Sequence, residues 1–233
     1  NIRAFVESAV DKDRHWNLPP VPQGHERDGQ PHYAVQGVEL MELMKQQALN
    51  FGTRVVGEDI VSVDFSGSVT QLTTSGGATI QAKTVIIATG ARANYLGLPS
   101  EEDYKNKGVS ACAVCDGALP LYRGKPLAVV GGGDSAVEEA SYLANLKGAA
   151  TIYLLVRRDQ MRASKVMQDR VLKNPKVEMV WNSTVIDVHG DDMISGVRLK
   201  DTVTGDERDM DCKGLFIAIG HEPNTKFLAG QIT

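Results

Sequence analysis

The stretch LAVVGGGDSAVEEASYL, residues 127–143, decides the fold of this chain. Its apolar start predicts a buried strand over Leu127–Val130, and the residues beyond the glycines predict a helix over Ser135–Leu146. Between strand and helix lies a GxGxxA pattern formed by Gly131, Gly133 and Ala136. In such a turn the first glycine allows the sharp bend, the second lets a pyrophosphate approach the backbone, and the alanine lets helix and strand pack closely. The stretch therefore predicts a dinucleotide site, with a glycine-rich turn that binds nothing as the alternative.

The same turn begins a repeating pattern of strands and helices. A strand over Thr151–Val156 and a helix over Ser164–Lys173 follow, which together make a βαβ unit with a parallel sheet. Asp134 and Ser135 lie at the start of the first helix, where free N–H groups face bound phosphates. Glu138 and Glu139 come next and are interpreted as complementing the helix dipole. Further strands are predicted at 177–181, 185–189, 196–200, 207–211 and 215–219.

The predicted strand 151–156 ends in VRRDQMRAS. Sites specific for NAD place an acidic residue after this strand to bind the ribose 2′-hydroxyl, but Arg157 and Arg158 stand there instead. Arg162 lies four residues beyond Arg158. Guanidinium groups bind the 2′-phosphate of NADP through charge-assisted, forked hydrogen bonds, so the pattern favours NADPH. The alternative is a solvated basic patch.

Another αβ region precedes a linker near Pro99–Lys107. GVELMELMKQQALNFG, residues 37–52, predicts a core helix whose apolar face consists of Leu40, Leu43, Met44, Ala48 and Phe51. Short strands follow as far as Gly90, and the apolar Val85–Ala88 predicts a strand buried on both faces. Residues 1–35 are rich in proline and polar residues and predict a loop.

ACAVCDGA, residues 111–118, holds two of the three cysteines. Zinc takes about four ligands, and beyond Cys112 and Cys115 the chain offers Cys212, scattered histidines and no second CxxC. A disulfide that closes so short a loop adds little stability. Spacing alone leaves a redox pair, half of a metal site and an inert pair open. Cys212, in DMDCKGLF, is interpreted as a small, half-buried apolar residue.

The composition of the chain argues against some classes of partner and indicates a type of cellular compartment. The net charge of −4 over 233 residues gives no basic field for nucleic acid or an anionic membrane. The chain shows no long apolar run and no signal-peptide pattern, and three cysteines fit a reducing compartment such as the cytoplasm. It begins at Asn1 without a methionine and ends after a strand and turn. We therefore expect a piece of a longer protein, whose targeting segment would lie outside the sequence.

Taken together, the motifs resemble one family. A nicotinamide donates a hydride and a disulfide accepts electrons through thiolate chemistry, and a flavin is the usual carrier between them. CAVCDG, GGGDSAVEEA and RRDQMRA together resemble the low-molecular-weight, NADPH-dependent thioredoxin reductases, which are flavoprotein disulfide reductases. IIATGA, YLGLPSEE and GLFIAIGHEPNTKFL extend the resemblance over most of Val38–Gly230.

This resemblance implies an α/β fold of two Rossmann-like nucleotide-binding domains with three-layer ββα architecture, the FAD domain being interrupted by the NADPH domain. Residues 1–107 would be part of the FAD domain, 108–220 the NADPH domain with the CxxC pair, and 221–233 the return linker into the FAD domain. The family's rotation of the NADPH domain would turn on linkers near Asn106–Ser110 and Gly220–Thr225.

The resemblance also implies a thioredoxin-disulfide reductase, an oxidoreductase that serves cell redox homeostasis. Hydride would pass from NADPH to FAD, electrons would pass to the Cys112–Cys115 disulfide, and the pair would reduce thioredoxin. Cys112 would attack thioredoxin, Cys115 would lie against the flavin, and Asp116 would act as the acid or base beside the pair.

Cofactor contacts and assembly follow from the same resemblance. FAD contacts would lie at Ile60, Thr89, Gly90 and Cys115, and Gly220 would join the glycine turn and the arginines in binding NADPH. A cytoplasmic homodimer is implied, with no metal and with neither nucleic acid nor a membrane as a partner.

The chain departs from the family pattern at its ends. The FAD fingerprint, a GxGxxA/G near the start, and the closing GDV-type segment are absent from the sequence. Three alternatives stay open: the flavoprotein partner of a peroxidase, which the arginines oppose; the reductase half of a fused reductase and thioredoxin; and a non-catalytic NADP-binding remnant.

Overall fold

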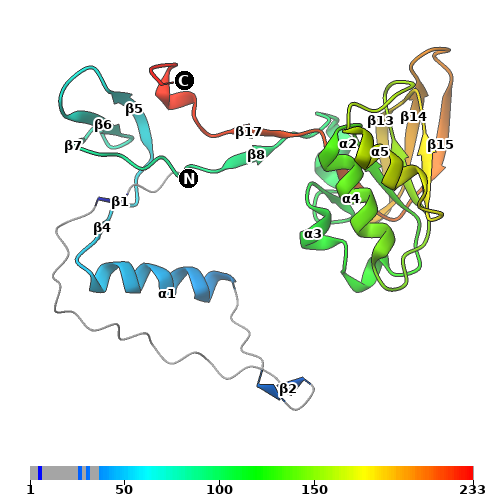
Figure 1. The fold of residues 1–233 in the computed structure, drawn as a ribbon, viewed down its shortest axis with the longest axis horizontal. Helices are drawn as coiled ribbons and strands as arrows, with labels where there is room; N and C mark the ends of the chain where they lie inside the picture. The colour runs from blue at the N-terminus through cyan, green and yellow to red at the C-terminus, as the bar shows by residue number, and fades with distance from the viewer. Residues whose placement is uncertain (1–4, 7–25, 28–29, 32–36, 233) are drawn as a thin grey trace. The chain divides into compact units, whose positions relative to one another are not determined.

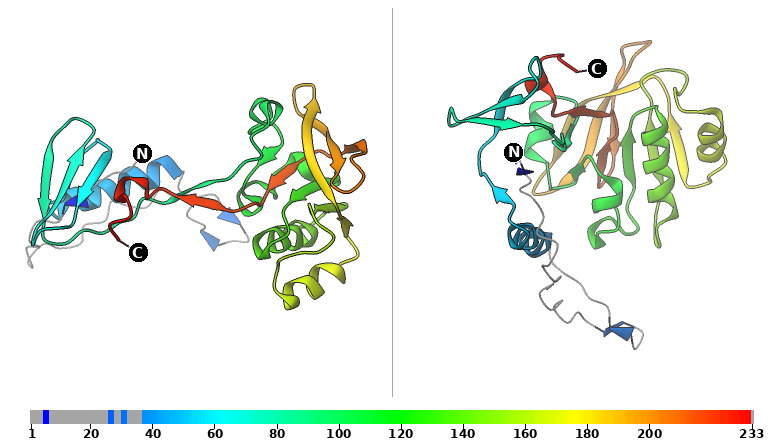
Figure 2. Two further views of the ribbon diagram at one scale, coloured as in Figure 1. Left: turned by 90° about the horizontal axis from the view of Figure 1, so that it is seen from above. Right: turned by 60° about the vertical axis from the view of Figure 1, so that its left-hand side comes forward.

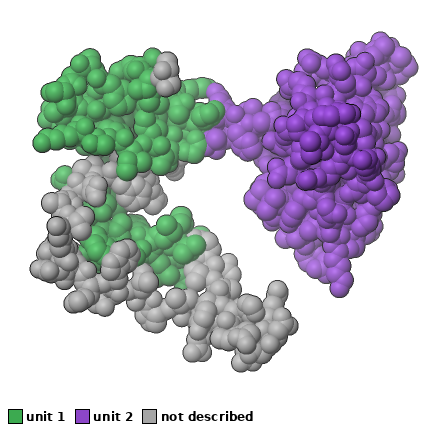
Figure 3. Space-filling view, viewed as in Figure 1, with its two compact units in different colours: residues 1–90, 223–233 green, residues 91–222 purple. Residues whose placement is uncertain are grey.

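A computed structural model describes residues 5–6, 26–27, 30–31 and 37–232. The chain divides into two compact units, called unit 1 (Asn1–Gly90 and Pro223–Thr233) and unit 2 (Ala91–Glu222), as Figure 3 shows. Unit 2 is inserted into the sequence of unit 1, which confirms the expected interruption of one domain by another.

Unit 2 is built on a parallel sheet with the strand order β12–β11–β10–β16–β9. The predicted strand–turn–helix pattern is confirmed to within one or two residues at most element ends. The five strands are β9 (Val109–Ser110), β10 (Leu127–Val130), β11 (Ile152–Leu155), β12 (Val177–Val180) and β16 (Leu215–Ile217).

Two further layers cover the parallel sheet, so unit 2 has the expected ββα architecture (Figures 1 and 2). On one face lie α4 (Asp134–Asn145) and α5 (Lys165–Leu172), with a core that includes Val129, Leu143 and Phe216. On the other face lies an antiparallel sheet, packed through a second core. Its strands are β13 (Ser183–Gly190), β14 (Ile194–Asp201) and β15 (Glu207–Asp211).

Short elements complete unit 2. They are α2 (Pro99–Asp103), α3 (Ala113–Asp116), the 3₁₀ turn η1 (Pro120–Tyr122) and the paired strands β8 (Ala91–Ala93) and β17 (His221–Pro223). Residues 106–110, expected as a linker, lie inside unit 2, where Gly108 has φ +116° and accepts a hydrogen bond from Leu215 N at 2.8 Å.

Unit 1 contains an antiparallel sheet of β5 (Ile60–Asp64), β6 (Thr70–Thr74) and β7 (Thr79–Ala82). Its small core consists of Ile60, Val63, Leu72 and Leu228. The remaining elements are α1 (Gly37–Asn50), β4 (Arg54–Val55) paired with β1 (Phe5–Val6), β2 (Glu26–Arg27) paired with β3 (Gln30–Pro31), and the 3₁₀ turn η2 (Lys226–Leu228).

Two expectations for unit 1 were wrong. Val85–Ala88 is not a strand, and the side chain of Ile86 is 88% exposed. A central parallel strand needs partners on both sides, and no described strand pairs with these residues. The predicted helix forms as α1, but Leu40 and Met44 on its apolar face are exposed, so it is not a core helix among the described residues.

Most of residues 1–35, predicted as a loop, lies outside the described residues. No helix within the described part of the chain is both long and apolar enough to cross a membrane.

Candidate functional site

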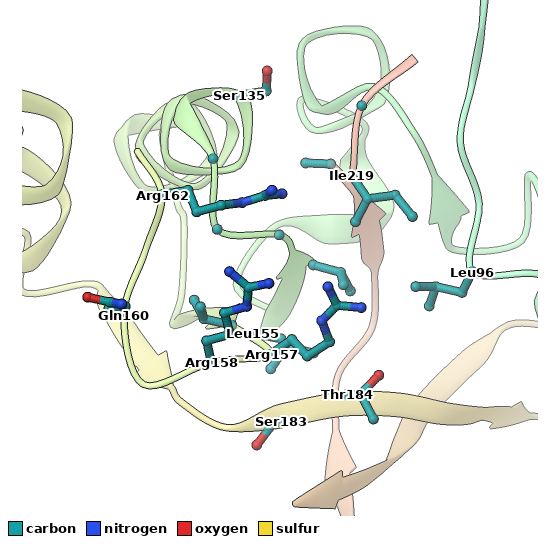
Figure 4. Close-up of a pocket in the computed structure, with 17 residues that line it drawn as sticks. Leu96, Ser135, Leu155, Arg157, Arg158, Gln160, Arg162, Ser183, Thr184 and Ile219 are labelled. Atoms are coloured by element: carbon teal, nitrogen blue, oxygen red, sulfur yellow. The ribbon is translucent and has the colours of Figure 1, made fainter. Parts of the chain in front are cut away.

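A pocket of about 490 Å³ opens at the carboxyl ends of β10, β11 and β16 in unit 2 (Figure 4). Ligands of open α/β sheets bind at this edge, where the strands end and the loops begin. Its lining includes the turn Gly131–Gly133, the segment after β11 with Arg157, Arg158 and Arg162, and Gly220 after β16.

Two glycines of the turn serve different purposes. Gly131 has φ +148°, and a Cβ there would lie 2.4 Å from the Ala218 carbonyl oxygen and 2.7 Å from the Ala136 Cβ. The protein's own packing therefore requires a glycine at this position. Gly133 has φ −94°, and a Cβ there would meet no protein atom within 4 Å. Its bare backbone leaves the pocket open at the first turn of α4, which fits the close approach of a phosphate.

This contrast gives a first prediction. Gly131→Ala will lower the free energy of unfolding by about 1–3 kcal/mol or more, because its Cβ overlaps fixed neighbours. Gly133→Ala will cost less than about 1 kcal/mol of stability, the effect of alanine at a helix N-cap, yet will weaken NADPH binding about tenfold or more. Thermal unfolding and calorimetric titration measure the two effects. Unchanged NADPH affinity in Gly133→Ala would show that no phosphate approaches this backbone.

The arginine segment is fixed to the glycine turn through its backbone. The Gly132 carbonyl oxygen accepts hydrogen bonds from Arg162 N at 2.6 Å and Ala163 N at 3.0 Å. Ser164 N donates to Asp134 Oδ1 at 2.8 Å, which ties the start of α5 to the start of α4. Buried Met161 and Ala163 flank the exposed Arg162. The path of this segment is therefore set before any ligand binds.

The guanidinium groups of Arg157, Arg158 and Arg162 converge on the same side of the pocket in Figure 4. Among the described residues, no carboxylate forms an ion pair with any of the three. Three cations gathered without a counter-ion favour a multiply charged anion, for which the forked guanidinium geometry is suited.

Seven of the nine residues predicted to bind NADPH line this one pocket. Asp134 instead holds Ser164, and Ala136 is buried beneath the turn. Ser183 and Thr184, which sequence reasoning missed, line the pocket from the start of β13. Their position just after the carboxyl end of β12 is the signal that could have found them. The other lining residues not predicted include Leu96, Gln160 and Ile219.

The second candidate centre is the disulfide between Cys112 and Cys115. Cys112 is the N-cap of the short helix α3, and its Sγ accepts a hydrogen bond from Cys115 N at 3.2 Å. Cys115 is exposed and Cys112 is half-buried. An N–H donor at a helix N-terminus stabilises a thiolate, so reduction would leave Cys112 as the more acidic and more reactive thiol.

Asp116 is held beside the cysteine pair. Ser110 Oγ, at the end of β9, lies 2.6 Å from Asp116 Oδ2 and donates to it, and Cys112 N donates to the same Ser110 Oγ at 3.1 Å. Burial, followed by the charge of Asp116, raises the pKa of the Tyr122 phenol. These hydrogen bonds hold the Asp116 carboxylate on the helix that carries the cysteine pair, and its acid–base role, implied by the family resemblance, stays a prediction.

α4 connects the two centres. It begins at the glycine turn, and α3 packs against it so closely that a Cβ on Gly117 would lie 2.4 Å from Leu143 Cδ2. Helix α4 therefore contacts the helix that carries the disulfide and also begins at the glycine turn of the pocket.

The predicted FAD contacts lie in unit 1, apart from Cys115. Ile60 is buried in the small core of that unit. The Thr89 carbonyl oxygen accepts from Asn224 Nδ2 at 3.0 Å, and the Gly90 carbonyl oxygen accepts from Asn224 N at 3.0 Å. The described part of unit 1 has no glycine turn leading from a strand into a helix as unit 2 has.

Cys212 directly follows β15 and is fully buried, and burial raises the pKa of its thiol to about 12. It therefore takes no part in thiol exchange. Within the described residues, no group of three or more histidine, cysteine, aspartate or glutamate side chains could hold a metal ion.

The fold, the nucleotide-type pocket and the CxxC disulfide are features typical of disulfide oxidoreductases that use a pyridine nucleotide. The model of the pyridine nucleotide-disulphide oxidoreductase family matches residues 5–233, and the chain belongs to that family. Within it, the chain is similar to proteins named thioredoxin reductase: 47% identical over 220 residues to that of Eremothecium gossypii, and 46% over 223 residues to thioredoxin reductase 1, mitochondrial, of Arabidopsis thaliana.

Both alignments cover 93% of this chain but only 65% and 56% of the relatives, so the chain spans less than two thirds of their length. Solved structures agree. Thioredoxin reductase from Giardia duodenalis matches with a TM-score of 0.74 at 38% identity, covering 87% of this chain and 65% of that one. The enzyme from Streptococcus pyogenes matches with a TM-score of 0.70 at 40% identity, covering 85% and 63%.

Proposed function

We propose that this chain is the central part of an NADPH-dependent, FAD-containing thioredoxin-disulfide reductase. The observation that carries the proposal is the packing of α3, which carries the CxxC disulfide, against α4, which begins at the glycine turn of the arginine-lined pocket. Relatives named thioredoxin reductase at 46–47% identity support the choice of thioredoxin as the partner.

The residues of unit 2 suit both the binding of NADPH and the reduction of the disulfide. When bound, NADPH would supply a hydride and FAD would carry its two electrons to the disulfide. The three arginines would hold the 2′-phosphate, and the N-terminus of α4 would hold the pyrophosphate. Reduction of the disulfide consumes two electrons and one proton and leaves a thiolate on Cys112 and a thiol on Cys115.

The reduced pair would then pass its two electrons to thioredoxin by two successive thiol–disulfide exchanges. The Cys112 thiolate attacks the thioredoxin disulfide to form a mixed disulfide, and Cys115 attacks Cys112 and re-forms the intramolecular bond. Asp116 would take the proton from Cys115 and return it to the departing thiolate. For net electron flow the pair must lie at or below the potential of thioredoxin, about −270 mV.

The described residues are better suited to bind NADPH than FAD, and this difference gives a second prediction. The pocket of unit 2 suits NADPH, but the described residues of unit 1 lack a pyrophosphate-binding turn. This chain alone will therefore bind NADPH and lose FAD during gel filtration. Calorimetric titration measures NADPH binding, and visible absorbance of the eluted protein measures the FAD that is retained. Stoichiometric FAD retained by the 233-residue chain would contradict the prediction.

The proposal as a whole is tested on the complete protein with its FAD. NADPH oxidation should follow added oxidised thioredoxin and should not follow a peroxidase offered in its place. A flavoprotein partner of a peroxidase would give the reverse result, and a non-catalytic remnant would give neither. A homodimer completes the proposal. Its compartment would be a reducing one such as the cytoplasm, which the three cysteines of the chain support.

A further inference from the structure

Glu139 lies on the side of α4 that faces the cysteine helix. Leu143, four residues along the same helix and so on the same face, contacts α3 near Gly117. Ala136, one turn before Glu139, is fully buried. The preceding residue, Glu138, is exposed. Of two adjacent glutamates with the same chemistry, only Glu139 is directed at the layer that carries the disulfide, which sequence periodicity did not reveal.

The carboxylate of Glu139 is poorly compensated. Its Oε2 atom is buried and has no hydrogen-bond partner among the described residues. The interaction that favours its charged form comes from the backbone N–H of Ala113, the residue directly after Cys112. A buried polar atom without a partner costs free energy and calls for a functional or structural reason. No ion pair with a lysine or arginine offsets this cost in the described part of the chain.

Backbone N–H groups in the first turn of α3 thus interact with two acidic groups, a cysteine sulfur and a carboxylate. Cys115 N–H donates to Cys112 Sγ, while Ala113 N–H serves the Glu139 carboxylate. In the disulfide state the sulfur atoms carry no charge. Reduction by two electrons and one proton places a negative charge on Cys112, beside a turn that already faces a carboxylate. Like charges at such a site oppose each other.

We propose that Glu139 is a positioning residue for the Cys112–Cys115 pair: its negative charge opposes the Cys112 thiolate, stabilises the disulfide relative to the dithiol, and keeps the reduction potential of the pair low. The proposal rests on the redox role given to the pair above. A low potential suits a pair that must donate electrons to another protein disulfide.

Other charged groups also lie near α4 and α3. Asp116 on α3 accepts from Ser110, and on α5 Lys165 and Asp169 pair with each other at 3.0 Å. Glu138 is the charged group that acts on Glu139. The other titratable side chains on α4 and on the elements that pack around it are Tyr122, Asp134, Tyr142, Tyr153, Arg170 and Glu178. Lys176, just before β12, donates from Nζ to the Ala144 carbonyl oxygen of α4 at 3.2 Å.

Burial, and to a smaller extent the charge of Glu138, raises the pKa of the Glu139 carboxyl. A group whose pKa is higher in the folded chain stabilises the fold below its ordinary pKa and loses that contribution as the pH rises through the raised value. Holding Glu139 in its charged form therefore costs the folded chain free energy, and protonation removes this cost. The same protonation removes the charge that acts on Cys112, so both effects should disappear together on acidification.

The test is the equilibrium of the 233-residue chain with dithiothreitol, in which dithiothreitol reduces the disulfide to the dithiol and is itself oxidised. The reduced fraction is measured by alkylation and mass spectrometry. Near neutral pH, Glu139→Gln should shift this equilibrium about tenfold toward the dithiol, equivalent to about 30 mV for a two-electron couple. The pKa of the Cys112 thiol, measured from its alkylation rate, should fall by about one unit.

Three comparisons make the result specific. Glu139→Met, which also lacks the charge, should give a shift in the same direction, and it replaces the Gln variant if that one fails to fold. Glu138→Gln, the matched control, should change the equilibrium by less than about twofold. Near pH 4, below the ordinary pKa of glutamate, the unmodified chain and Glu139→Gln should converge. Glu139→Gln should also unfold at a higher temperature than the unmodified chain near neutral pH but not near pH 4.

An unchanged equilibrium in both Glu139 variants, or an equal shift in Glu138→Gln, overturns the proposal. The measurement needs neither FAD nor thioredoxin. A chain in which Glu139 tunes the pair but the complete protein fails to reduce thioredoxin would therefore refute the proposed function and leave this inference standing.

Discussion

Cys112→Ser and Cys115→Ser will each reduce NADPH-driven reduction of thioredoxin by the complete protein to background, but the two variants will stop at different points. An intact CxxC pair must both receive electrons and pass them on, and one sulfur cannot do both. In the proposed enzyme, Cys112→Ser would leave a Cys115 thiolate next to the flavin and should show thiolate-to-flavin charge-transfer absorbance. Cys115→Ser should lack that absorbance and should trap thioredoxin as a mixed disulfide through Cys112.

The structure favours this assignment over its reverse. Cys112 Sγ receives the N–H of Cys115 at the start of α3, which stabilises a thiolate at the first position and not at the second. Cys212→Ser serves as the control, because a buried thiol with a pKa of about 12 should leave turnover intact. Trapping by Cys112→Ser and absorbance in Cys115→Ser would reverse the roles, and turnover in both variants would remove the pair from the mechanism.

Replacing Arg157 and Arg158 by alanine will remove about 2–4 kcal/mol of the preference for NADPH over NADH, roughly 30- to 1,000-fold in relative affinity. The two guanidinium groups reach the pocket without a carboxylate partner in the described residues, so their charge is available to a 2′-phosphate. NADH lacks that phosphate, and its affinity should change little. Calorimetric titration of both cofactors measures the difference.

Arg170→Ala is the matched control, because Arg170 is an exposed arginine on α5 that does not line the pocket. It should leave both affinities unchanged within about twofold, as expected for a surface charge. Equal affinities for NADPH and NADH in the unmodified chain would show that the arginines are a solvated patch.

Sequence reasoning succeeded where the signal is local. The strand, turn and helix around Gly131 follow from periodicity and glycine spacing, and Arg157 and Arg158 are placed by their distance from that turn. Periodicity and glycine spacing lie within one short stretch of sequence, so these features can be predicted although β10 pairs with the distant β16.

Sequence reasoning failed where burial depends on a distant partner. Val85–Ala88 has the composition of a central strand, but a strand forms only with neighbours to pair with, and the described residues provide none. Glu139 was grouped with Glu138 because both follow the glycine turn. Only the packing of α3 on α4 distinguishes the buried carboxylate from the exposed one. Long-range contacts of this kind leave no mark on a single sequence.

The two hydrogen bonds that the Gly132 carbonyl oxygen accepts from Arg162 N and Ala163 N have a practical consequence for protein engineering. They hold the arginine segment by its main chain, independently of which side chains it carries. A change of coenzyme from NADPH to NADH should therefore be attainable by exchanging individual side chains at positions 157, 158 and 162, without transplanting a loop from another enzyme. Randomised libraries confined to these three codons would sample the useful variants while the scaffold stays intact.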